Sequence, residues 1–369
     1  MGSEINNWMF QLVDELGPEL IIHIYDVKNG LKAIVVVDNT SAGPTIGGIR
    51  MSLEVTTREV ARLARGMTLK NAMARLPHGG GKSGIIADPA KVDKENLIRA
   101  FARKIKHISE YIPGPDMGTS ETEMAYIKDE IERAVGLPRE LGGIPLDQIG
   151  STGYGVYIST RIAAQYIDLD LNGARLSVEG FGSVGKHSAR FLAEKGVVLI
   201  AASDSKGTIY NPEGLDVEEL ILFKETTGSV RNYPHGDKLM VTDLLDISTD
   251  IFIPAARPDV ITKSNADVLD AKLIVQGANI PITLEAERLL HERGVLSIPD
   301  FVANAGGVIT ASVEYHGGCE KDAFDRIEET ISSNTRDVLE MANKQNLTPR
   351  DAALSIASER VKKAMEYRE

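Results

Sequence analysis

Residues 174–185 read Ala-Arg-Leu-Ser-Val-Glu-Gly-Phe-Gly-Ser-Val-Gly, an apolar run that leads directly into three spaced glycines. The run predicts a strand, the residues after it predict a helix to Glu194, and 197–202 predict a second strand that ends near Asp204. In this setting the first glycine allows a tight turn, the second lets a pyrophosphate approach the backbone, and the third lets helix and strand pack closely. The stretch therefore indicates a Rossmann-type dinucleotide-binding unit rather than a coincidental strand-to-helix turn.

Two further predicted strands, 250–256 and 272–279, follow in the same alternating order and end in small residues. Ligands in parallel sheets bind at the carboxyl ends of the strands. The candidate cofactor-binding residues at these ends are Gly180, Gly182, Ser183, Val184, Gly185, Asp204, Ala255, Ala256 and Asn279. Asp204 would accept a hydrogen bond from a ribose 2′-hydroxyl and repel a 2′-phosphate, which favours NAD, while the nearby Lys206 keeps NADP possible.

The stretch 66–88 places two lysines in apolar and glycine-rich surroundings, where surface charges are not expected. Lys70 falls on the apolar stripe of a predicted helix, so its amine either reaches out to solvent or points into a cleft. The run Gly79-Gly80-Gly81-Lys82 comes shortly before a predicted strand that starts at Ile85. A phosphate-binding P-loop is excluded, because Leu76 stands where its first glycine is needed and a strand follows instead of a helix.

The composition favours a soluble intracellular protein. The chain has 369 residues, enough for two domains, and its formal net charge of −12 argues against sequence-independent binding to nucleic acid or anionic lipid. No apolar run approaches the roughly 20 residues of a membrane-spanning helix, and residues 1–10 lack the zones of a signal peptide. Cys319 is the only cysteine, which excludes an intrachain disulfide and a cysteine metal cluster. We expect a cytoplasmic protein.

Five short motifs occur together: Gly47-Gly48-Ile49-Arg50, Gly66-Met67-Thr68-Leu69-Lys70-Asn71, Gly79-Gly80-Gly81-Lys82, Pro115-Asp116-Met117-Gly118-Thr119 and Asn304-Ala305-Gly306-Gly307. In this order they resemble the glutamate/leucine/phenylalanine/valine dehydrogenase family. The resemblance covers nearly the whole chain, from about Ile21 to the end. It implies a reversible, NAD(P)-dependent oxidative deamination of an L-amino acid to a 2-oxo acid and ammonia.

The resemblance also implies roles for individual residues. Lys70 would bind the substrate α-carboxylate, and Gly47 and Gly48 would pass the backbone beside the substrate. Lys82 resembles the catalytic lysine and Asp116 its acid–base partner, and a lysine in a dehydrated cleft beside another cation has a lowered pKa that suits a general base. Hydride would pass directly to the nicotinamide, so no metal is expected. Three more residues resemble those with which family members contact the nicotinamide, its ribose or the substrate. They are Thr152, Asn279 and Asn304.

The fold implied by the resemblance is α/β, with two domains and a cleft between them. We expect an N-terminal α/β substrate domain at residues 1–148 and a Rossmann-type NAD(P)-binding domain at 149–320. The C-terminal helices at 321–369 would return to the substrate domain. The resemblance further implies a homo-oligomer, either a hexamer or an octamer.

Four positions predict the character of the side-chain pocket. Glutamate-specific members of the family carry a lysine directly before the Gly-Gly pair, where this sequence has Ile46, and a serine where it has Ala311. A buried carboxylate without a polar partner is unfavourable. Together with Gly114 and Val308, these residues predict an apolar and roomy pocket, so we expect a branched or aromatic L-amino acid as substrate.

Two alternatives stay open. Glutamate remains a candidate substrate, because Pro115-Asp116 and the turn at 203–207 are more similar to glutamate-type members of the family. A non-catalytic regulatory relative is the other class of protein to consider. Loss of Lys82 or Asp116 would be its signature, and both residues are present.

Overall fold

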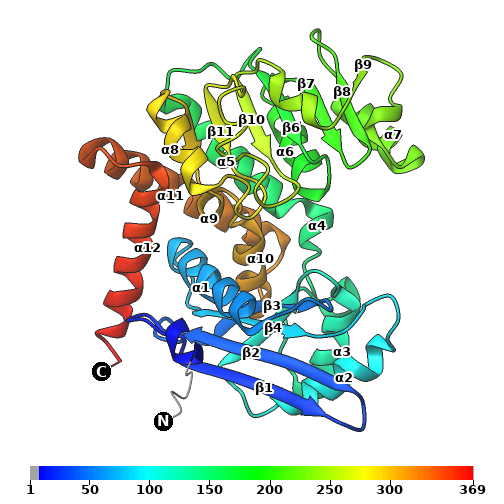
Figure 1. The fold of residues 1–369 in the computed structure, drawn as a ribbon, viewed down its shortest axis with the longest axis vertical. Coiled ribbons are helices and arrows are strands. Elements are labelled where there is room, and N and C mark those ends of the chain that lie inside the picture. Colours follow the sequence, from blue (N-terminus) through cyan, green and yellow to red (C-terminus); the bar gives the residue numbers. More distant parts are fainter. Residues whose placement is uncertain (1–7, 369) are drawn as a thin grey trace, which may run out of the picture. The chain divides into compact units, whose positions relative to one another are not determined.

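The computed structural model describes residues 8–368, which divide into two compact units (Figure 1). Unit 1 contains the described residues up to Pro145 together with Ala311–Glu320 and the C-terminal segment from Ile356. Unit 2 contains Leu146–Thr310 and Lys321–Ser355. Each unit is built around its own β-sheet, which confirms the expected α/β fold class. The domain roles assigned to 1–148, 149–320 and 321–369 stay predictions.

The sheet of unit 1 has five strands in the order β1-β2-β4-β3-β5. The strands are β1 (Leu20–Asp26), β2 (Leu31–Asn39), β3 (Thr45–Met51), β4 (Gly80–Ile85) and β5 (Tyr111–Pro115). β2 pairs antiparallel with β1 and β4, whereas β3 pairs parallel with β4 and β5. The carboxyl ends of β3, β4 and β5 therefore lie at one edge of the sheet, where ligands of parallel strands bind.

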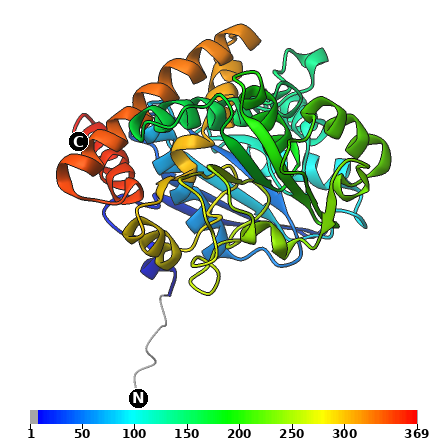
Figure 2. The same cartoon turned by 90° about the horizontal axis from the view of Figure 1, so that it is seen from above.

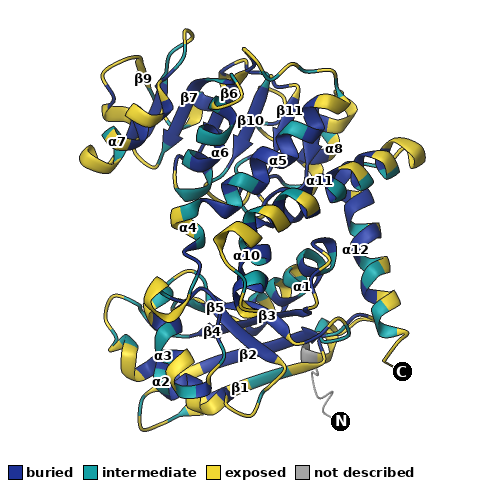
Figure 3. Cartoon of the chain, turned by 180° about the vertical axis from the view of Figure 1, so that it is seen from behind, coloured by how far each residue is buried: buried dark blue, intermediate teal, exposed yellow. Residues whose placement is uncertain are grey.

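Alternating residues of β2 contribute to two hydrophobic cores, one on each face of this sheet. The odd-numbered residues from Leu31 to Val37 pack with α2 (Lys94–Ile105) and α3 (Glu121–Ile131). The even-numbered residues Ile34 and Val36 pack with α1 (Thr57–Met73). Figure 3 shows the resulting burial as dark blue along β2. The face that α1 covers also carries the candidate site.

β4 includes the glycines that precede the strand predicted at Ile85, so it begins earlier than expected. A Cβ on Gly80 would lie 2.0 Å from Thr68 N in α1, and a Cβ on Gly84 would lie 2.3 Å from Val55 Cγ1 just before that helix. Glycine inside a strand marks close approach of another segment. These residues form a strand, despite low intrinsic propensity, because the missing side chains let α1 pack directly on the sheet.

The sheet of unit 2 has seven strands in the order β12-β11-β10-β6-β7-β8-β9. The strands are β6 (Arg175–Glu179), β7 (Val198–Asp204), β8 (Gly207–Tyr210), β9 (Asp237–Leu239), β10 (Ile251–Pro254), β11 (Leu273–Val275) and β12 (Leu296–Ile298). Those from β12 to β7 are parallel, and β8 and β9 add antiparallel at the edge. β6 leads through the glycine loop into α6 (Ser183–Ala193), which confirms the predicted strand–loop–helix order.

Helices cover both sheets. In unit 2, α7 (Val217–Thr227) and α8 (Leu284–Glu292) lie near opposite ends of the sheet (Figure 2). The other helices are η1 (Trp8–Leu12), η2 (Arg139–Leu141), α4 (Leu146–Ile149), α5 (Ser151–Tyr166), η3 (Val230–Asn232), η4 (Thr242–Asp246), α9 (Asp300–Ala303), α10 (Gly306–Tyr315), α11 (Glu320–Gln345) and α12 (Pro349–Met365). Both α10 and α12 contribute residues to each unit. Across residues 8–368, no helix combines the length and the apolarity needed to cross a membrane.

Candidate active site

Lys82 lies on the face of the unit 1 sheet that α1 covers. Because side chains alternate along a strand, Lys82 projects to the same side as Gly80 and Gly84, whose Cβ positions would meet α1 and Val55, two residues before that helix. Lys82 is only 7% exposed. The flanking glycines leave space for the long side chain, so a lysine can be buried here without displacing the helix.

An ion pair joins Lys82 to Asp116, with 3.0 Å between Nζ and Oδ2. Burial lowers the pKa of the Lys82 amine, and the Asp116 carboxylate offsets part of this effect. Burial alone would raise the pKa of Asp116, but attraction to Lys82 and Arg50 outweighs it, so that pKa lies below its usual value. The Lys82–Asp116 pair thus combines a lysine whose neutral form is favoured by burial with a carboxylate that stays ionised.

The turn after β5 fixes the position of Asp116. Thr119 Oγ1 donates a hydrogen bond to the Ile49 carbonyl at 2.8 Å and accepts one from Asp116 N at 3.0 Å. Gly118 has a φ of +84°, and a Cβ there would lie 2.4 Å from Met51 O. A left-handed conformation in such close contact requires glycine. The turn therefore ties Asp116 to the end of β3.

Arg50 and Glu59 extend the Lys82–Asp116 pair into a network of four charges, and sequence reasoning alone gave neither of them a role. Arg50 Nε lies 3.1 Å from Asp116 Oδ2, and Arg50 Nη1 lies 2.6 Å from Glu59 Oε1. Alternation along β3 places Arg50 on the same face as Gly48, a signal that could have identified it. The contribution of Glu59 depends on how α1 packs, and no local pattern indicates it.

Gly47 and Gly48 lie where β3 meets β4 and the turn that carries Asp116. A Cβ on Gly47 would lie 1.6 Å from Gly81 O, and one on Gly48 would lie 2.8 Å from Asp116 Cβ. The Gly47 carbonyl accepts a hydrogen bond from the Tyr111 hydroxyl at 2.8 Å. No side chain fits at either glycine, so the backbone of β3 is bare beside the Lys82–Asp116 pair.

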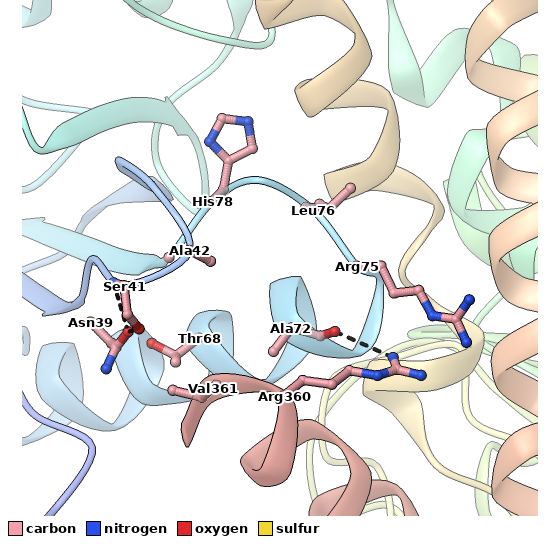
Figure 4. Close-up of a pocket in the computed structure, with 11 residues that line it drawn as sticks. Asn39, Ser41, Ala42, Thr68, Ala72, Arg75, Leu76, His78, Arg360 and Val361 are labelled. Atoms are coloured by element: carbon pink, nitrogen blue, oxygen red, sulfur yellow. Dashed lines mark hydrogen bonds between the residues drawn. The ribbon is translucent and has the colours of Figure 1, made fainter. Parts of the chain in front are cut away.

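Lys70 is partly buried near the C-terminal end of α1. The last turn of α1 is held by α12, because Arg360 Nη1 donates to the carbonyls of Ala72 at 3.3 Å and Met73 at 2.7 Å. A cavity of about 350 Å³ adjoins this turn, and Figure 4 shows Arg360 reaching the Ala72 carbonyl on its wall. The Lys82–Asp116 pair does not line this cavity, so the cavity is separate from the candidate catalytic groups.

A buried hydrophobic cluster in unit 1 is formed by Ile46, Ile112, Val135 and Ala311. A Cβ on Gly114 would lie 3.1 Å from Val135 Cγ2, so this glycine borders the cluster. Three of the four positions predicted for the side-chain pocket are therefore brought together by the fold. The fourth, Val308, is partly buried on the part of α10 that belongs to unit 2.

The glycine loop of unit 2 fits the pyrophosphate of a dinucleotide. Gly180 has a φ of +89°, and a Cβ there would lie 2.5 Å from Ala256 Cβ, while one on Gly185 would lie 2.1 Å from Gly180 O. A Cβ on Gly182 would meet open space, so the backbone where α6 begins is accessible. Because Gly182 has no side chain with which to cap α6, the first amides, at Ser183 and Val184, suit a bound anion.

A cavity of about 390 Å³ adjoins this loop, and its walls include Gly182, Ser183, Lys186 and Lys224. Lys224 Nζ donates to the Phe181 carbonyl at 2.5 Å, which holds a cation against the loop. Burial lowers the pKa of the Lys224 amine, and the nearby Asp204 carboxylate offsets part of that effect. Positive charge beside an accessible helix N-terminus again fits a phosphate-bearing ligand.

Asp204 lies at the end of β7, where the fingerprint predicts the ribose-binding acid. Its carboxylate accepts hydrogen bonds from Lys206 N at 2.9 Å, Ser229 Oγ at 3.0 Å and Val230 N at 2.8 Å. The side chain of Lys206 donates to the Gly228 carbonyl at 3.1 Å. Asp204 thus fixes the loop at residues 228–230, in addition to any contact that it makes with a ribose.

Asn304 organises the loop after β11. Its Nδ2 atom donates to Asn279 Oδ1 at 3.1 Å and to the carbonyls of Gly277 and Ala278 at 3.2 Å. Among the residues that the structure describes, the buried Oδ1 of Asn304 has no hydrogen-bond partner, so a ligand amide could donate to it. This orphaned acceptor and the glycine loop together fit a nicotinamide dinucleotide.

The remaining predicted cofactor residues lie around the same strand ends of unit 2. A Cβ on Gly277 would lie 3.0 Å from Val184 Cγ1 and 3.2 Å from Ala255 Cβ, so these side chains enclose the end of β11. Thr152 lies in the first turn of α5, with its Oγ1 3.0 Å from the Cβ position of Gly307. The predicted residues are thus gathered within unit 2.

Comparison with known proteins shows the family. A family model described as Glutamate/Leucine/Phenylalanine/Valine dehydrogenase matches residues 142–369, and one described as Glu/Leu/Phe/Val dehydrogenase, dimerisation domain, matches residues 18–133. Glutamate dehydrogenase from Aeropyrum pernix is 42% identical over 356 residues, which cover 89% of this chain and 85% of that protein. NADP-specific glutamate dehydrogenase from Saccharolobus shibatae is 38% identical over 358 residues, 89% of this chain and 83% of that protein.

Solved structures of amino acid dehydrogenases also align with this chain, in agreement with the family matches. The hetero-hexameric glutamate dehydrogenase from Thermus thermophilus, in a Leu-bound form, aligns with a TM-score of 0.86 at 29% identity over 95% of this chain and 90% of that one. L-tryptophan dehydrogenase from Nostoc punctiforme aligns with a TM-score of 0.77 at 27% identity over 97% and 99% of the two chains. Matched along almost its whole length and equipped with a nucleotide loop of fitting geometry, the chain belongs to the Glu/Leu/Phe/Val dehydrogenase family of NAD(P)-dependent amino acid dehydrogenases.

Proposed function

We propose that this chain catalyses the reversible, NAD(P)-dependent oxidative deamination of an L-amino acid to a 2-oxo acid and ammonia, with the Lys82–Asp116 pair as its proton-transfer centre. The observation that carries this assignment is the 3.0 Å contact between a buried lysine amine and a carboxylate. Burying a lysine is unfavourable, and perturbed titratable groups of this kind concentrate at functional sites.

In the proposed reaction, Lys70 binds the substrate α-carboxylate and the bare backbone at Gly47 and Gly48 lies beside the substrate. A nicotinamide dinucleotide held by the glycine loop and Asn304 of unit 2 would supply the hydride acceptor for this oxidation. Asp116 moves protons to and from the amino group as the amine becomes an imine. The neutral amine of Lys82 takes a proton from the water that attacks the imine carbon, after which ammonia leaves and the 2-oxo acid remains.

The nucleotide is assigned to unit 2. The pyrophosphate would bind at Gly180–Gly185, and Asn304, Asn279 and Thr152 would contact the nicotinamide or its ribose. Asp204 would contact the adenosine ribose, with Ala255 and Ala256 beside the cofactor. The accessible N-terminus of α6 and the unpaired side-chain oxygen Oδ1 of Asn304 support this assignment.

Glutamate is the better supported substrate, because the similar proteins from Aeropyrum pernix and Saccharolobus shibatae are named glutamate dehydrogenases. The preference for an apolar side chain that the sequence predicts is not confirmed by these similarities. An apolar amino acid remains a second candidate on one specific observation, the buried cluster in which Ile46 and Ala311 stand among other apolar side chains. Such surroundings leave a γ-carboxylate without polar partners.

An oligomer is also part of the proposal. The N-terminal family match carries the description of a dimerisation domain, and the aligned Thermus thermophilus protein is a hetero-hexamer. We therefore propose that this chain assembles with copies of itself, as a hexamer in preference to an octamer. Analytical ultracentrifugation of the purified protein measures this mass directly.

Variants of the pair test the reaction. Lys82→Ala and Asp116→Asn should each abolish amino-acid-dependent reduction of NAD or NADP, while binding of the reduced nucleotide, followed by its fluorescence, persists. Lys91→Ala is the matched control, because the Lys91 side chain is 81% exposed, and it should behave as the wild type. Deamination by either pair variant at the wild-type rate would refute the assigned roles.

A substrate panel decides between the two candidates. Initial rates on Glu, Leu, Val, Phe and Trp, each with NAD and with NADP, give kcat/KM for every combination. The highest value for glutamate would show that the apolar cluster does not set the preference. The highest value for Leu, Val, Phe or Trp would show that it does.

A further inference from the structure

Arg50 contacts the Lys82–Asp116 pair and Glu59 contacts Arg50, but neither residue has a part in the proposed reaction. Arg50 bridges two carboxylates, through Nε to Asp116 at 3.1 Å and through Nη1 to Glu59 at 2.6 Å. Lys82 contacts the same oxygen of Asp116, Oδ2, at 3.0 Å. Asp116 therefore has two cationic partners, and Arg50 is the one that keeps its charge at every pH of interest.

This second cation matters at the moment when Lys82 is neutral. If Lys82 were the sole cation beside Asp116, losing its proton would strand a carboxylate whose side chain is only 22% exposed. An unpaired charge in such surroundings is unfavourable. Lys82 would then retain its proton, or Asp116 would take it up. Arg50 removes this penalty, because it stays charged and bonded to Asp116.

We propose that Arg50 and Glu59 form a positioning pair that sets how firmly Lys82 holds its proton. Arg50 keeps Asp116 ionised when Lys82 is neutral, and Glu59 limits the effect by holding the other end of the guanidinium group. The inference rests on the proposed function, in which Lys82 is the base and Asp116 its partner. The two residues act in opposite directions, since the Arg50 charge disfavours a proton on Lys82 and the Glu59 charge favours it.

Charged groups reach Lys82 from several elements packed against β4. They are Arg50 on β3, Asp116 after β5 and Glu59 on α1, the helix that also carries Lys70. Tyr111 lies on the opposite face, against Gly81, and burial raises the pKa of its hydroxyl, so it stays neutral. On β2, the residue paired with Lys82 is Val36. Arg50 and Glu59 are thus the charges that can be altered while every assigned catalytic or substrate-binding group is kept.

Two neutral substitutions, Arg50→Gln and Glu59→Gln, test the pair in the ligand-free enzyme. Competitive acetylation with acetic anhydride across a pH series, read by mass spectrometry, reports the titration midpoint of Lys82, with the exposed Lys91 as internal reference. The midpoint should rise in Arg50→Gln and fall in Glu59→Gln, each by about half a pH unit or more. Arg50→Lys keeps the charge and should stay closer to the wild type. Glu54→Gln, at an exposed glutamate in the segment between β3 and α1, should leave the midpoint unchanged.

The pH profile of kcat/KM provides the second measurement, and its acid limb should move in the same two opposite directions. Shifts of the same sign in both variants, or no shift in either, would overturn the positioning pair. Glu59 has a side chain 36% exposed, so Glu59→Gln keeps the test open even if Arg50→Gln does not fold. If the Lys82 midpoints of the two variants shift in opposite directions but the wild-type protein shows no amino-acid turnover, the proposed function is refuted and this inference is not. If the wild-type protein turns over an amino acid but the Lys82 midpoints do not shift, this inference is refuted and the proposed function is not.

Discussion

Replacing Gly80 by alanine should destabilise unit 1. The added Cβ would lie 2.0 Å from Thr68 N, 2.3 Å from Thr68 Oγ1 and 2.5 Å from Ala64 O. All three atoms belong to α1 and two are backbone atoms, so no change of rotamer relieves the clash and the helix must move away from β4. Overpacking of this kind destabilises by about 1–3 kcal/mol. For a unit of this size that lowers the melting temperature by about 2–12 °C.

The same displacement should slow the enzyme, because α1 carries Lys70 and Glu59 and packs over Lys82. A shift of about 1 Å in a substrate-positioning element can lower activity by as much as about 100-fold. The expected loss of kcat/KM in Gly80→Ala is therefore between tenfold and that limit, without any change in a charged residue. Thermal scans by circular dichroism and initial rates on the preferred amino acid measure the two effects.

Gly66→Ala is the matched control. Gly66 lies in the middle of α1, exposed, and a Cβ there would have no neighbour within 4 Å. Alanine is favoured over glycine in a helix interior by about 0.5–1 kcal/mol, so this variant should melt above the wild type. If Gly80→Ala also melted at or above the wild-type temperature, the direct packing of α1 on β4 would be refuted.

Two further predictions concern buried charge. Arg350→Met should destabilise unit 2 by about 3–5 kcal/mol, since Arg350 bonds to the buried Asp300 at 3.0 Å and to the buried Glu287. The exposed Arg326→Met is the control, and an equal loss of stability in the two variants would contradict this prediction. Acidification should destabilise unit 1 through His78, because burial lowers the pKa of His78 from 6.5 to about 4. Above pH 6.5 the imidazole is neutral in both states, whereas between pH 6.5 and 4 the unfolded chain gains a proton that the folded protein excludes, so stability falls. His78→Phe should flatten melting temperature against pH in this window, and an unchanged slope would count against the argument.

The parts of the fold that depend on short stretches of chain could be predicted from the sequence. The fingerprint at 174–185 is one example, because a tight turn, a close approach and a helix N-terminus are all specified within 12 residues. β6, the glycine loop and α6 occur as expected. The role of Asn304 is not specified locally, since its side chain bonds to the carbonyls of Gly277 and Ala278, which lie 27 and 26 residues earlier in the chain.

The network around Lys82 could be predicted only in part, because its contacts join distant positions. Arg50 and Asp116 are 66 residues apart, and they meet because β3 and β5 pair in parallel, with Gly48 beside Gly114 and Ile49 beside Pro115. Glu59 enters from a helix whose distance from the sheet is set by Gly80 and Gly84. Local periodicity predicts on which face of a strand or helix a side chain lies. It does not predict which charged side chains from other elements lie against that face.

The same glycines explain both the unexpected strand and the chemistry proposed for it. Side chains at positions 80 and 84 would push α1 off the sheet, and β4 would then expose Lys82 to water, where its pKa would return towards the ordinary value for lysine. Their absence weakens the intrinsic preference for a strand, yet it creates the dry, narrow space in which a lysine can lose its proton. The Gly-Lys combination therefore serves burial of the lysine, whereas the phosphate binding that we propose is assigned to the separate glycine loop of unit 2.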